Sequence, residues 1–133
     1  MSDALPLDIS QGATLRGSEY GWTLASFPDA IARASASSYA CLGSQFQFRL
    51  DEGAICEMYW LKADSKARTA GETWADYSRR SCSEVLSKFR HFVSTSDFVK
   101  EASNWPTLEF DPVKTVVFVA YFVTEADLAD PAQ

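Results

Sequence analysis

Eight consecutive apolar residues, Val116-Val-Phe-Val-Ala-Tyr-Phe-Val123, lie near the C-terminal end of a chain of 133 residues. The run is too short to cross a bilayer, and its β-branched and aromatic residues favour a strand over a helix. Because side chains alternate along a strand, Phe118 and Phe122 face one side and Val119 faces the other. Both faces are apolar, which predicts the central strand of a sheet that is covered on both sides, by helices or by a partner chain.

Two alternating runs in residues 41–61, on either side of Asp51-Glu-Gly53, predict a β-hairpin. A three-residue loop with Gly53 in the left-handed conformation fits a hairpin with a G1-type bulge. This register makes one face wholly apolar, whereas a two-residue loop would place Phe48 opposite Glu57. The predicted pairs are Leu50 with Ala54, Phe48 with Cys56, Phe46 with Met58, and Ser44 with Trp60.

Two helices are predicted from capping signals and periodicity. Ser26-Phe-Pro-Asp29 is typical of a helix start with Ser26 as the cap, and this helix should run over residues 27–39. A long amphipathic helix over about residues 70–93 follows the capping-box spacing Thr69-x-x-Glu72. Its apolar side chains lie on one arc: Trp74, Tyr77, Val85, Leu86, Phe89, Phe92 and Val93.

The remaining segments predict short elements and loops. Leu5, Leu7 and Ile9 alternate as in a short strand, and residues 11–20 read as a loop. We expect residues 1–20 and 125–133 to be loosely ordered. The chain as a whole predicts a single α+β domain spanning residues 1–133. Its mainly antiparallel sheet, made of the hairpin at 41–61 and the C-terminal strand at 114–124, packs against the long helix and shorter helices.

The chain is acidic, with 12 lysine and arginine residues against 18 aspartate and glutamate residues and a net charge of −6. Residues 1–61 carry three basic and seven acidic groups, residues 62–93 seven and four, and residues 94–133 two and seven. The acidic ends argue against nucleic acid as a partner, because neutralising phosphate requires a dominant basic face. They would instead steer a basic partner towards the chain.

Cysteine and histidine usage argues against a metal site. Cys41, Cys56 and Cys82 form no CxxC pair and the chain has one histidine, so neither a metal nor a cofactor is expected. The first residues lack the basic n-region and apolar h-region of a signal peptide. We therefore expect a cytoplasmic protein with reduced thiols.

No catalytic motif is found in the sequence: G-x-S-x-G, S-x-x-K and Gly-rich phosphate loops are absent. Cys82 and His91 lie nine residues apart on the predicted long helix, hence on opposite sides, and cannot form a nucleophile–base pair. An enzymatic role is therefore not favoured, although Glu57 projects from the polar face of the hairpin and could serve as an acid or base.

The candidate binding residues fall into two groups. On the polar hairpin face Glu57 lies between Gln47 and Arg49, and a structural Glu57–Arg49 pair is the alternative interpretation. The second group consists of the aromatic residues Trp60, Trp74 and Tyr77. We expect these side chains to converge with Trp22 at one end of the sheet, where they would form either a binding pocket or an aromatic end of the core. The full set is Gln45, Gln47, Arg49, Glu57, Tyr59, Trp60, Asp64, Trp74 and Tyr77.

These features favour a small acidic protein that acts by protein–protein interaction and occludes a partner, as an inhibitor or immunity protein does. A small-molecule-binding domain or enzyme is the second hypothesis, with a pocket near Trp60, Trp74 and Tyr77 and with Glu57 as its polar anchor. A homodimer that closes over one face of the sheet is the third. Neither nucleic acid nor a membrane is expected as a partner.

Overall fold

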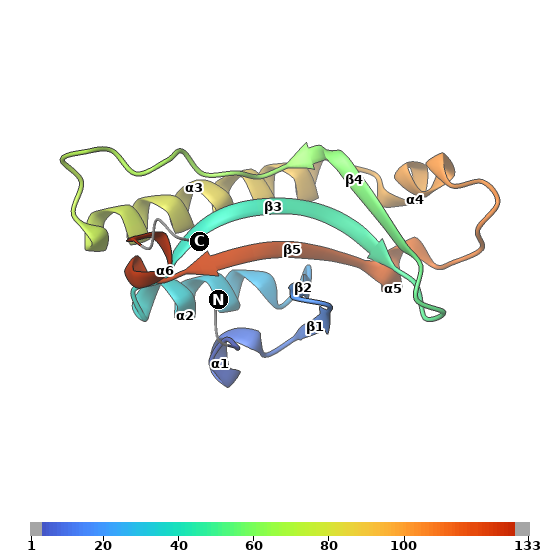
Figure 1. Ribbon diagram of the computed structural model, residues 1–133. Coiled ribbons are helices and arrows are strands. Elements are labelled where there is room, and N and C mark those ends of the chain that lie inside the picture. The colour runs from blue at the N-terminus through green and yellow to red at the C-terminus, as the bar shows by residue number, and fades with distance from the viewer. Residues whose placement is uncertain (1–3, 130–133) are drawn as a thin grey trace.

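The central strand of the sheet is β5 (Val116–Val123), as the sequence predicts (Figure 1). The structure is a computed structural model that describes residues 4–129, so the ends of the two segments predicted to be loosely ordered lie outside it. Its antiparallel strands are arranged in the order β1-β2-β5-β3-β4. The other strands are β1 (Ala13–Arg16), β2 (Glu19–Thr23), β3 (Ala40–Arg49) and β4 (Ile55–Lys62). β5 therefore pairs with β3 of the predicted hairpin on one side and with β2 on the other.

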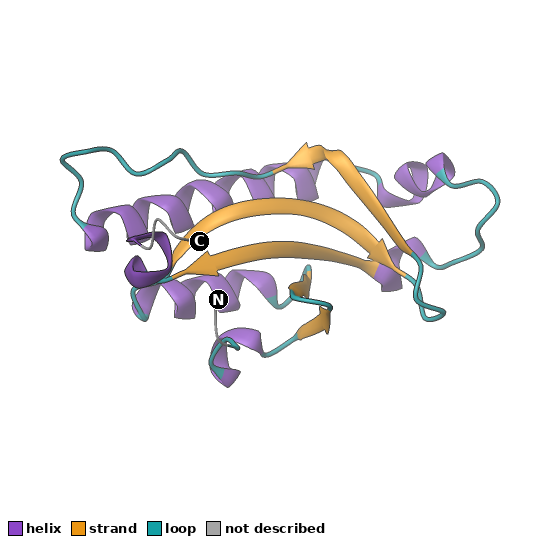
Figure 2. Ribbon diagram, viewed as in Figure 1, coloured by secondary structure: helices purple, strands orange, loops and turns teal. Residues whose placement is uncertain are grey.

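Helices cover one face of this sheet (Figure 2). The two longest are α2 (Phe27–Ala36) and α3 (Trp74–Thr95), which contribute most of the buried helical side chains of the core. The shorter helices are α1 (Leu7–Ser10), α4 (Phe98–Glu101), α5 (Pro112–Thr115) and α6 (Glu125–Ala129), with a 3-10 turn at Ala102–Asn104. The predicted α+β class, with an antiparallel sheet packed on a long helix, is confirmed. None of the helices in residues 4–129 combines the length and apolar character needed to cross a membrane.

The core between the sheet and the helices is aromatic and centres on Phe118 of β5. Between ring centroids, Phe118 lies 4.6 Å from Phe27, 4.9 Å from Phe46 and 5.2 Å from Phe89. Each aromatic pair of this kind contributes about 0.5–1.5 kcal/mol beyond the burial of apolar area. α2, β3 and α3 thus converge on one side chain of the central strand.

The β3–β4 hairpin has the predicted loop. Gly53 has a φ of 103°, in the left-handed region that favours glycine. On either side of the loop, the Leu50 N–H donates a hydrogen bond to the Ala54 carbonyl oxygen over 2.9 Å. The pairs that follow also match the prediction: Phe48 with Cys56, and Phe46 with Met58.

Past its middle the hairpin departs from the prediction. Gln45 pairs with Lys62, so the three residues before Lys62 form a bulge in β4. The predicted pair of Ser44 with Trp60 is therefore wrong. Because the bulge shifts the phase of alternation, Leu61 enters the core and is 7% exposed, whereas Trp60 is 49% exposed.

The N-terminal segment also differs from the prediction. Helix α1 replaces the short strand predicted over residues 5–9, and residues 11–20, predicted as a loop, contain β1 and the start of β2. Gly17, with a φ of 62°, lies in the tight turn between these strands. Both strands are too short to be recognised from the alternation of their side chains. Strand β2 is positioned by its pairing with β5, where Trp22 lies opposite Phe118.

Helix α2 starts where the sequence predicts, but the Ser26 side chain does not cap it as predicted. α2 begins at Phe27 and ends at Ala36, short of the predicted residue 39. The Ser26 side chain makes no capping bond: its oxygen accepts a hydrogen bond from the Thr23 hydroxyl over 2.7 Å, and its hydroxyl donates to the Gly12 carbonyl oxygen over 3.2 Å. Ser26 thus ties the start of α2 to the segment before β1.

The long helix starts a few residues later than its predicted capping box. Thr73 caps α3, and its side-chain oxygen accepts a hydrogen bond from the Asp76 N–H over 3.1 Å. The Thr69 N–H instead donates to the Glu72 carboxylate over 3.2 Å, in the loop before the helix. The capping-box contact therefore exists, but it orders a turn and does not begin a helix.

Candidate functional site

The polar face of the hairpin lies on the side of the sheet away from α2 and α3, and three of its predicted site residues are joined by hydrogen bonds. Gln45 donates its amide to Glu57 Oε1 over 3.2 Å, and the Tyr59 hydroxyl donates to Glu57 Oε2 over 2.9 Å. The bond to Glu57 raises the pKa of Tyr59, because removing the phenol proton would set two negative charges side by side. These contacts hold the Glu57 carboxylate in place on the sheet surface.

Arg49 and Gln47 lie deeper on the same face and are structural. They are 5% and 1% exposed, and Arg49 Nε donates to Gln47 Oε1 over 2.7 Å. The guanidinium also donates to the Thr14 carbonyl oxygen over 2.7 Å and to the Glu19 carbonyl oxygen over 3.0 Å. The Glu57–Arg49 pair considered from the sequence is therefore wrong: Arg49 fastens the β1–β2 hairpin, and its burial lowers its pKa.

An open hollow of about 460 Å³ lies beside Glu57 on this face. β2, β3, β4, β5 and the segment after β4 all contribute to it. Its lining is Glu19, Leu42, Gly43, Ser44, Gln45, Glu57, Lys62, Asp64, Ser65 and Tyr121. Of the predicted site residues, Gln45, Glu57 and Asp64 therefore meet here.

Asp64 reaches the hollow because the segment after β4 stays bonded to β3. The Ser65 N–H donates to the Leu42 carbonyl oxygen over 3.3 Å, and the Ser65 hydroxyl donates to the Cys41 carbonyl oxygen over 2.6 Å. Gly43, with a φ of 97°, permits this approach, since a Cβ there would lie 2.5 Å from Asp64 Cα. The glycine is thus required both by its conformation and by the close contact.

The hollow is acidic. Glu19, Glu57 and Asp64 line it against a single described cation, Lys62, and none of the three carboxylates forms an ion pair within residues 4–129. The Tyr121 hydroxyl donates a hydrogen bond to the Glu19 carboxylate. Burial and then this bond raise the pKa of Tyr121 to about 12. Sequence reasoning missed Glu19 and Tyr121, because only the pairing of β2 and β3 with β5 brings them next to the hairpin.

The aromatic side chains predicted to converge lie at different places. Trp60 stacks on Trp105 and donates its indole N–H to Glu101, beyond the end of α3. Trp74 is the first residue of α3 and packs on Tyr77. The 22 residues of α3 rise about 33 Å between these two places. The predicted pocket near Trp60, Trp74 and Tyr77 is therefore not formed.

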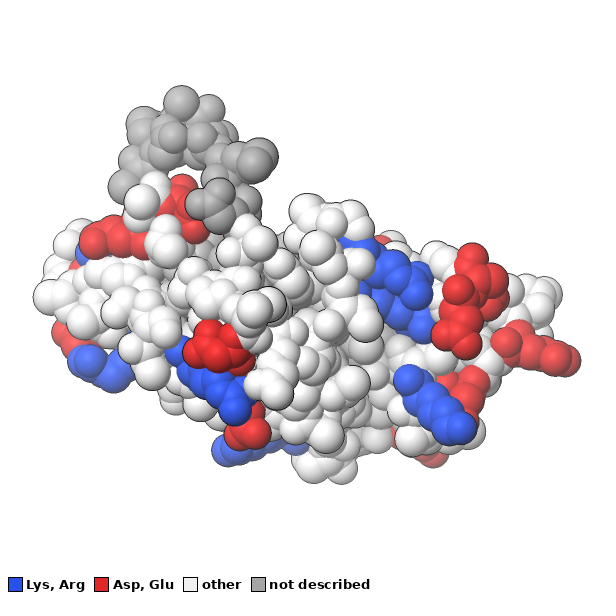
Figure 3. Space-filling model, turned by 90° about the horizontal axis from the view of Figure 1, so that it is seen from below, with Lys and Arg blue, Asp and Glu red and all other residues white. Residues whose placement is uncertain are grey.

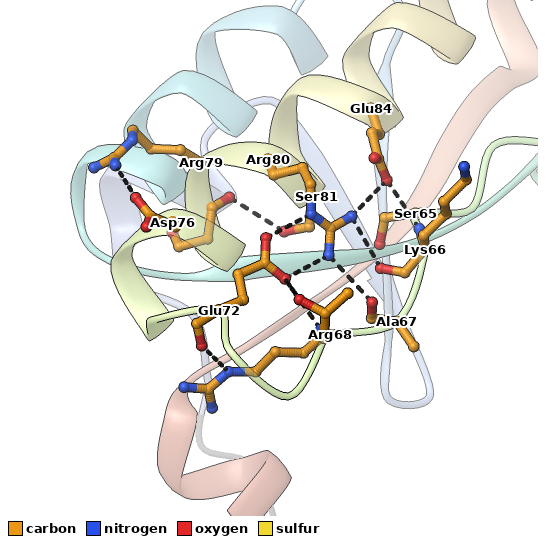
Figure 4. A network of polar contacts seen from close by, with 12 residues as sticks. Ser65, Lys66, Ala67, Arg68, Glu72, Asp76, Arg79, Arg80, Ser81 and Glu84 are labelled. Carbon is orange, nitrogen blue, oxygen red and sulfur yellow. Dashed lines mark hydrogen bonds and ion pairs between the residues drawn. The ribbon is translucent and has the colours of Figure 1, made fainter.

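Two arginines of the long helix, Arg79 and Arg80, pair with neighbouring carboxylates (Figure 4). Arg80 donates to Glu72 over 2.6 Å and to Glu84 over 3.0 Å, and also to the backbone carbonyls of Lys66 and Ala67. The bond from Arg80 lowers the pKa of Glu72 to about 2. This network fastens the loop between β4 and α3 to the helix.

The three cysteine side chains are buried in the structure. Burial raises the pKa of all three thiols, that of Cys82 to about 11, so they are protonated and unreactive at neutral pH. No group of three or more His, Cys, Asp and Glu side chains suited to a metal ion occurs in residues 4–129. Basic and acidic side chains also alternate on the face shown in Figure 3, which offers no continuous basic strip.

Comparison of the chain with protein-family models, with curated proteins and with solved structures gave no match.

Proposed function

We propose that this chain is a binding protein whose acidic hollow receives a basic side chain of a partner protein, in the manner of an inhibitor that occludes its target. The observation that carries the proposal is the set of three unpaired carboxylates, Glu19, Glu57 and Asp64, around one open hollow of the described sheet surface. A lysine or arginine placed among them would gain charge-assisted hydrogen bonds, which are about twice as strong as neutral ones.

The way these carboxylates are held supports recognition. Glu57 is oriented by Gln45 and Tyr59, and Glu19 by Tyr121. Acceptors that are already oriented lose little conformational entropy when a partner binds. Complementary charge would also speed the encounter of the partners, since the chain as a whole carries a net charge of −6.

The hollow fits a protein partner better than the two alternatives. A small-molecule site is usually concave and mostly apolar and encloses its ligand, whereas this hollow is open and lined chiefly by polar side chains. A homodimer closed over this face would bring Glu19, Glu57 and Asp64 towards their own copies. Like charges placed opposite each other cost free energy, so the face disfavours self-association.

The proposal can be tested with a basic peptide as the probe. We would titrate the ¹⁵N-labelled protein with a peptide of alternating lysine and glycine, and in parallel with its glutamate–glycine counterpart. The basic peptide should shift the amide resonances of Ser44, Gln45, Glu57 and Asp64, and its affinity should fall as salt is added. The acidic peptide should shift none of them.

Matched variants show whether the carboxylates are responsible. The double variant Glu57→Gln, Asp64→Asn should bind the basic peptide about tenfold more weakly. Asp29→Asn removes an exposed carboxylate from α2, on the helical side of the sheet, and should leave the affinity unchanged. Equal binding by the double variant and the unmodified protein would contradict the proposed function.

A further inference from the structure

Trp60 lies on the surface because of the bulge in β4. The bulge places Leu61 in the core and leaves Trp60 49% exposed. Bulges often redirect a side chain towards a functional role, and tryptophan is the residue type most enriched among the energetic centres of protein interfaces.

Contacts between aromatic rings connect Trp60 to the core. Its centroid lies 6.1 Å from that of Trp105, with 23° between the ring planes. Trp105 in turn lies 5.9 Å from Phe48, which is fully buried. The indole N–H of Trp60 also donates to Glu101 Oε1 over 2.8 Å. Stacking and hydrogen bonding thus hold this exposed ring in one orientation, so binding to it would cost little entropy.

The surroundings of this ring are acidic. Residues 97–114 contain two lysines and four acids, which are Asp97, Glu101, Glu109 and Asp111. A second copy of the chain would meet like charge here, whereas a basic partner would meet the opposite charge.

We propose that Trp60 and Glu101 form an anchor for an arginine side chain of a basic partner protein. The planar guanidinium would stack on the exposed part of the indole and pair with the Glu101 oxygen that Trp60 does not use. Arginine suits this arrangement better than lysine, because its delocalised, weakly hydrated cation stacks on aromatic rings. The inference rests on the proposed function in one respect, the basic character of the partner, and it places a second contact outside the hollow.

The test uses the full chain labelled with ¹⁵N and a probe peptide of alternating arginine and glycine. The chain has four tryptophans, each of which should give an indole N–H resonance, and that of Trp60 should shift during the titration. The arginine peptide should bind about three- to fivefold more tightly than its lysine counterpart, the size expected for an exposed cation–π contact.

Three variants separate the anchor from the fold. Glu101→Gln keeps an acceptor for the indole but removes the charge, and it should weaken the binding of the arginine peptide. Trp60→Phe should weaken the preference for arginine while preserving an aromatic ring, in case Trp60→Ala disturbs the strand. Trp74→Phe is the control, because Trp74 is a partly buried tryptophan at the other end of α3 and should change nothing.

The outcomes distinguish this inference from the proposed function. Shifts confined to Ser44, Gln45, Glu57 and Asp64, with Glu101→Gln binding normally, would overturn the anchor and leave the hollow as the binding site. Shifts at Trp60 alone would support the anchor and count against the hollow. A Trp60 resonance that moves with protein concentration alone, or with a cello-oligosaccharide in place of the peptide, would identify another occupant and overturn the anchor.

Discussion

The guanidinium of Arg49 occupies the space that a side chain at Gly21 would need. A Cβ at position 21 would lie 2.9 Å from Arg49 Cζ and 2.8 Å from Val117 Cγ2. The absence of a side chain at this position of β2 therefore lets the arginine lie over the face of the sheet and reach its carbonyl acceptors on β1 and β2. This contact explains how a charged residue can be buried on the face of the sheet that lies away from α2 and α3.

Gly21→Ala should accordingly destabilise the fold. The new methyl group would force Arg49 or Val117 to move, and overpacking of this kind costs about 1–3 kcal/mol. Chemical denaturation measures the change in the free energy of unfolding. Gly71→Ala is the control, because nothing lies within 4 Å of a Cβ at that position. Equal stability of the two variants would mean that Arg49 does not need the space at Gly21.

The bulge in β4 makes opposite predictions for two neighbouring residues. Leu61→Ala should cost about 2–5 kcal/mol, since Leu61 lies in the core. Trp60→Ala should cost less although it removes a larger side chain, because about half of the ring is already in water. Urea denaturation of both variants checks this order. A larger loss of stability for Trp60→Ala than for Leu61→Ala would contradict the bulge and support the register predicted from alternation.

The Arg80–Glu72 contact predicts a pH dependence of stability. The pKa of Glu72 is lowered from 4.5 to about 2 in the folded chain, mainly by the hydrogen bond from Arg80. A lowered carboxyl pKa stabilises the fold above the unfolded value and loses that effect as the pH falls through the folded value. The unmodified protein should therefore be more stable than Arg80→Met at pH 7, and the difference should narrow between about pH 4.5 and pH 2.

Thermal unfolding across this pH range provides the measurement, and Arg79→Met is the matched control. Arg79 pairs with Asp76 on an exposed part of the same helix, where an ion pair contributes about 0–1 kcal/mol. A stability difference for Arg80→Met that stays constant from pH 7 to pH 2 would show that Glu72 is not its partner.

Tyr121 should report on Glu19 at the edge of the hollow. The pKa of Tyr121 is raised to about 12 by burial and by its hydrogen bond to Glu19. Glu19→Gln removes the negative charge and should lower the pKa of Tyr121 towards its ordinary value, though burial would keep it elevated. Ultraviolet titration of phenolate formation measures this pKa, and the variant Tyr121→Phe identifies which part of the absorbance change belongs to Tyr121. An unchanged titration would place Glu19 away from Tyr121.

Features that depend on one continuous segment could be predicted from the sequence. The apolar run at 116–123 indicates a strand at the centre of the sheet, and alternation around Gly53 indicates the loop and the pairs nearest to it. Periodicity likewise indicates α3, although not its first residue. In each case the signal is the spacing of apolar side chains along the chain, which local geometry alone converts into a buried face.

The site depended on contacts between distant segments. Arg49 could have paired with Glu57 on the neighbouring strand, but its guanidinium donates to carbonyl groups of β1 and β2 instead. Glu19 and Tyr121 meet Glu57 only because β2 and β3 pair with β5. Trp60 and Trp74 are separated by the length of a helix whose position the aromatic spacing does not reveal.

The amino-acid sequence thus determined the layers of this protein, since burying apolar periodic faces leaves few arrangements of a strand, a hairpin and a long helix. Only the tertiary structure decided which polar groups meet on the open face and which tryptophan reaches the surface. The physical reason is that apolar burial follows from average spacing, whereas hydrogen bonds and ion pairs require particular atoms from separate segments to come within about 3 Å of one another.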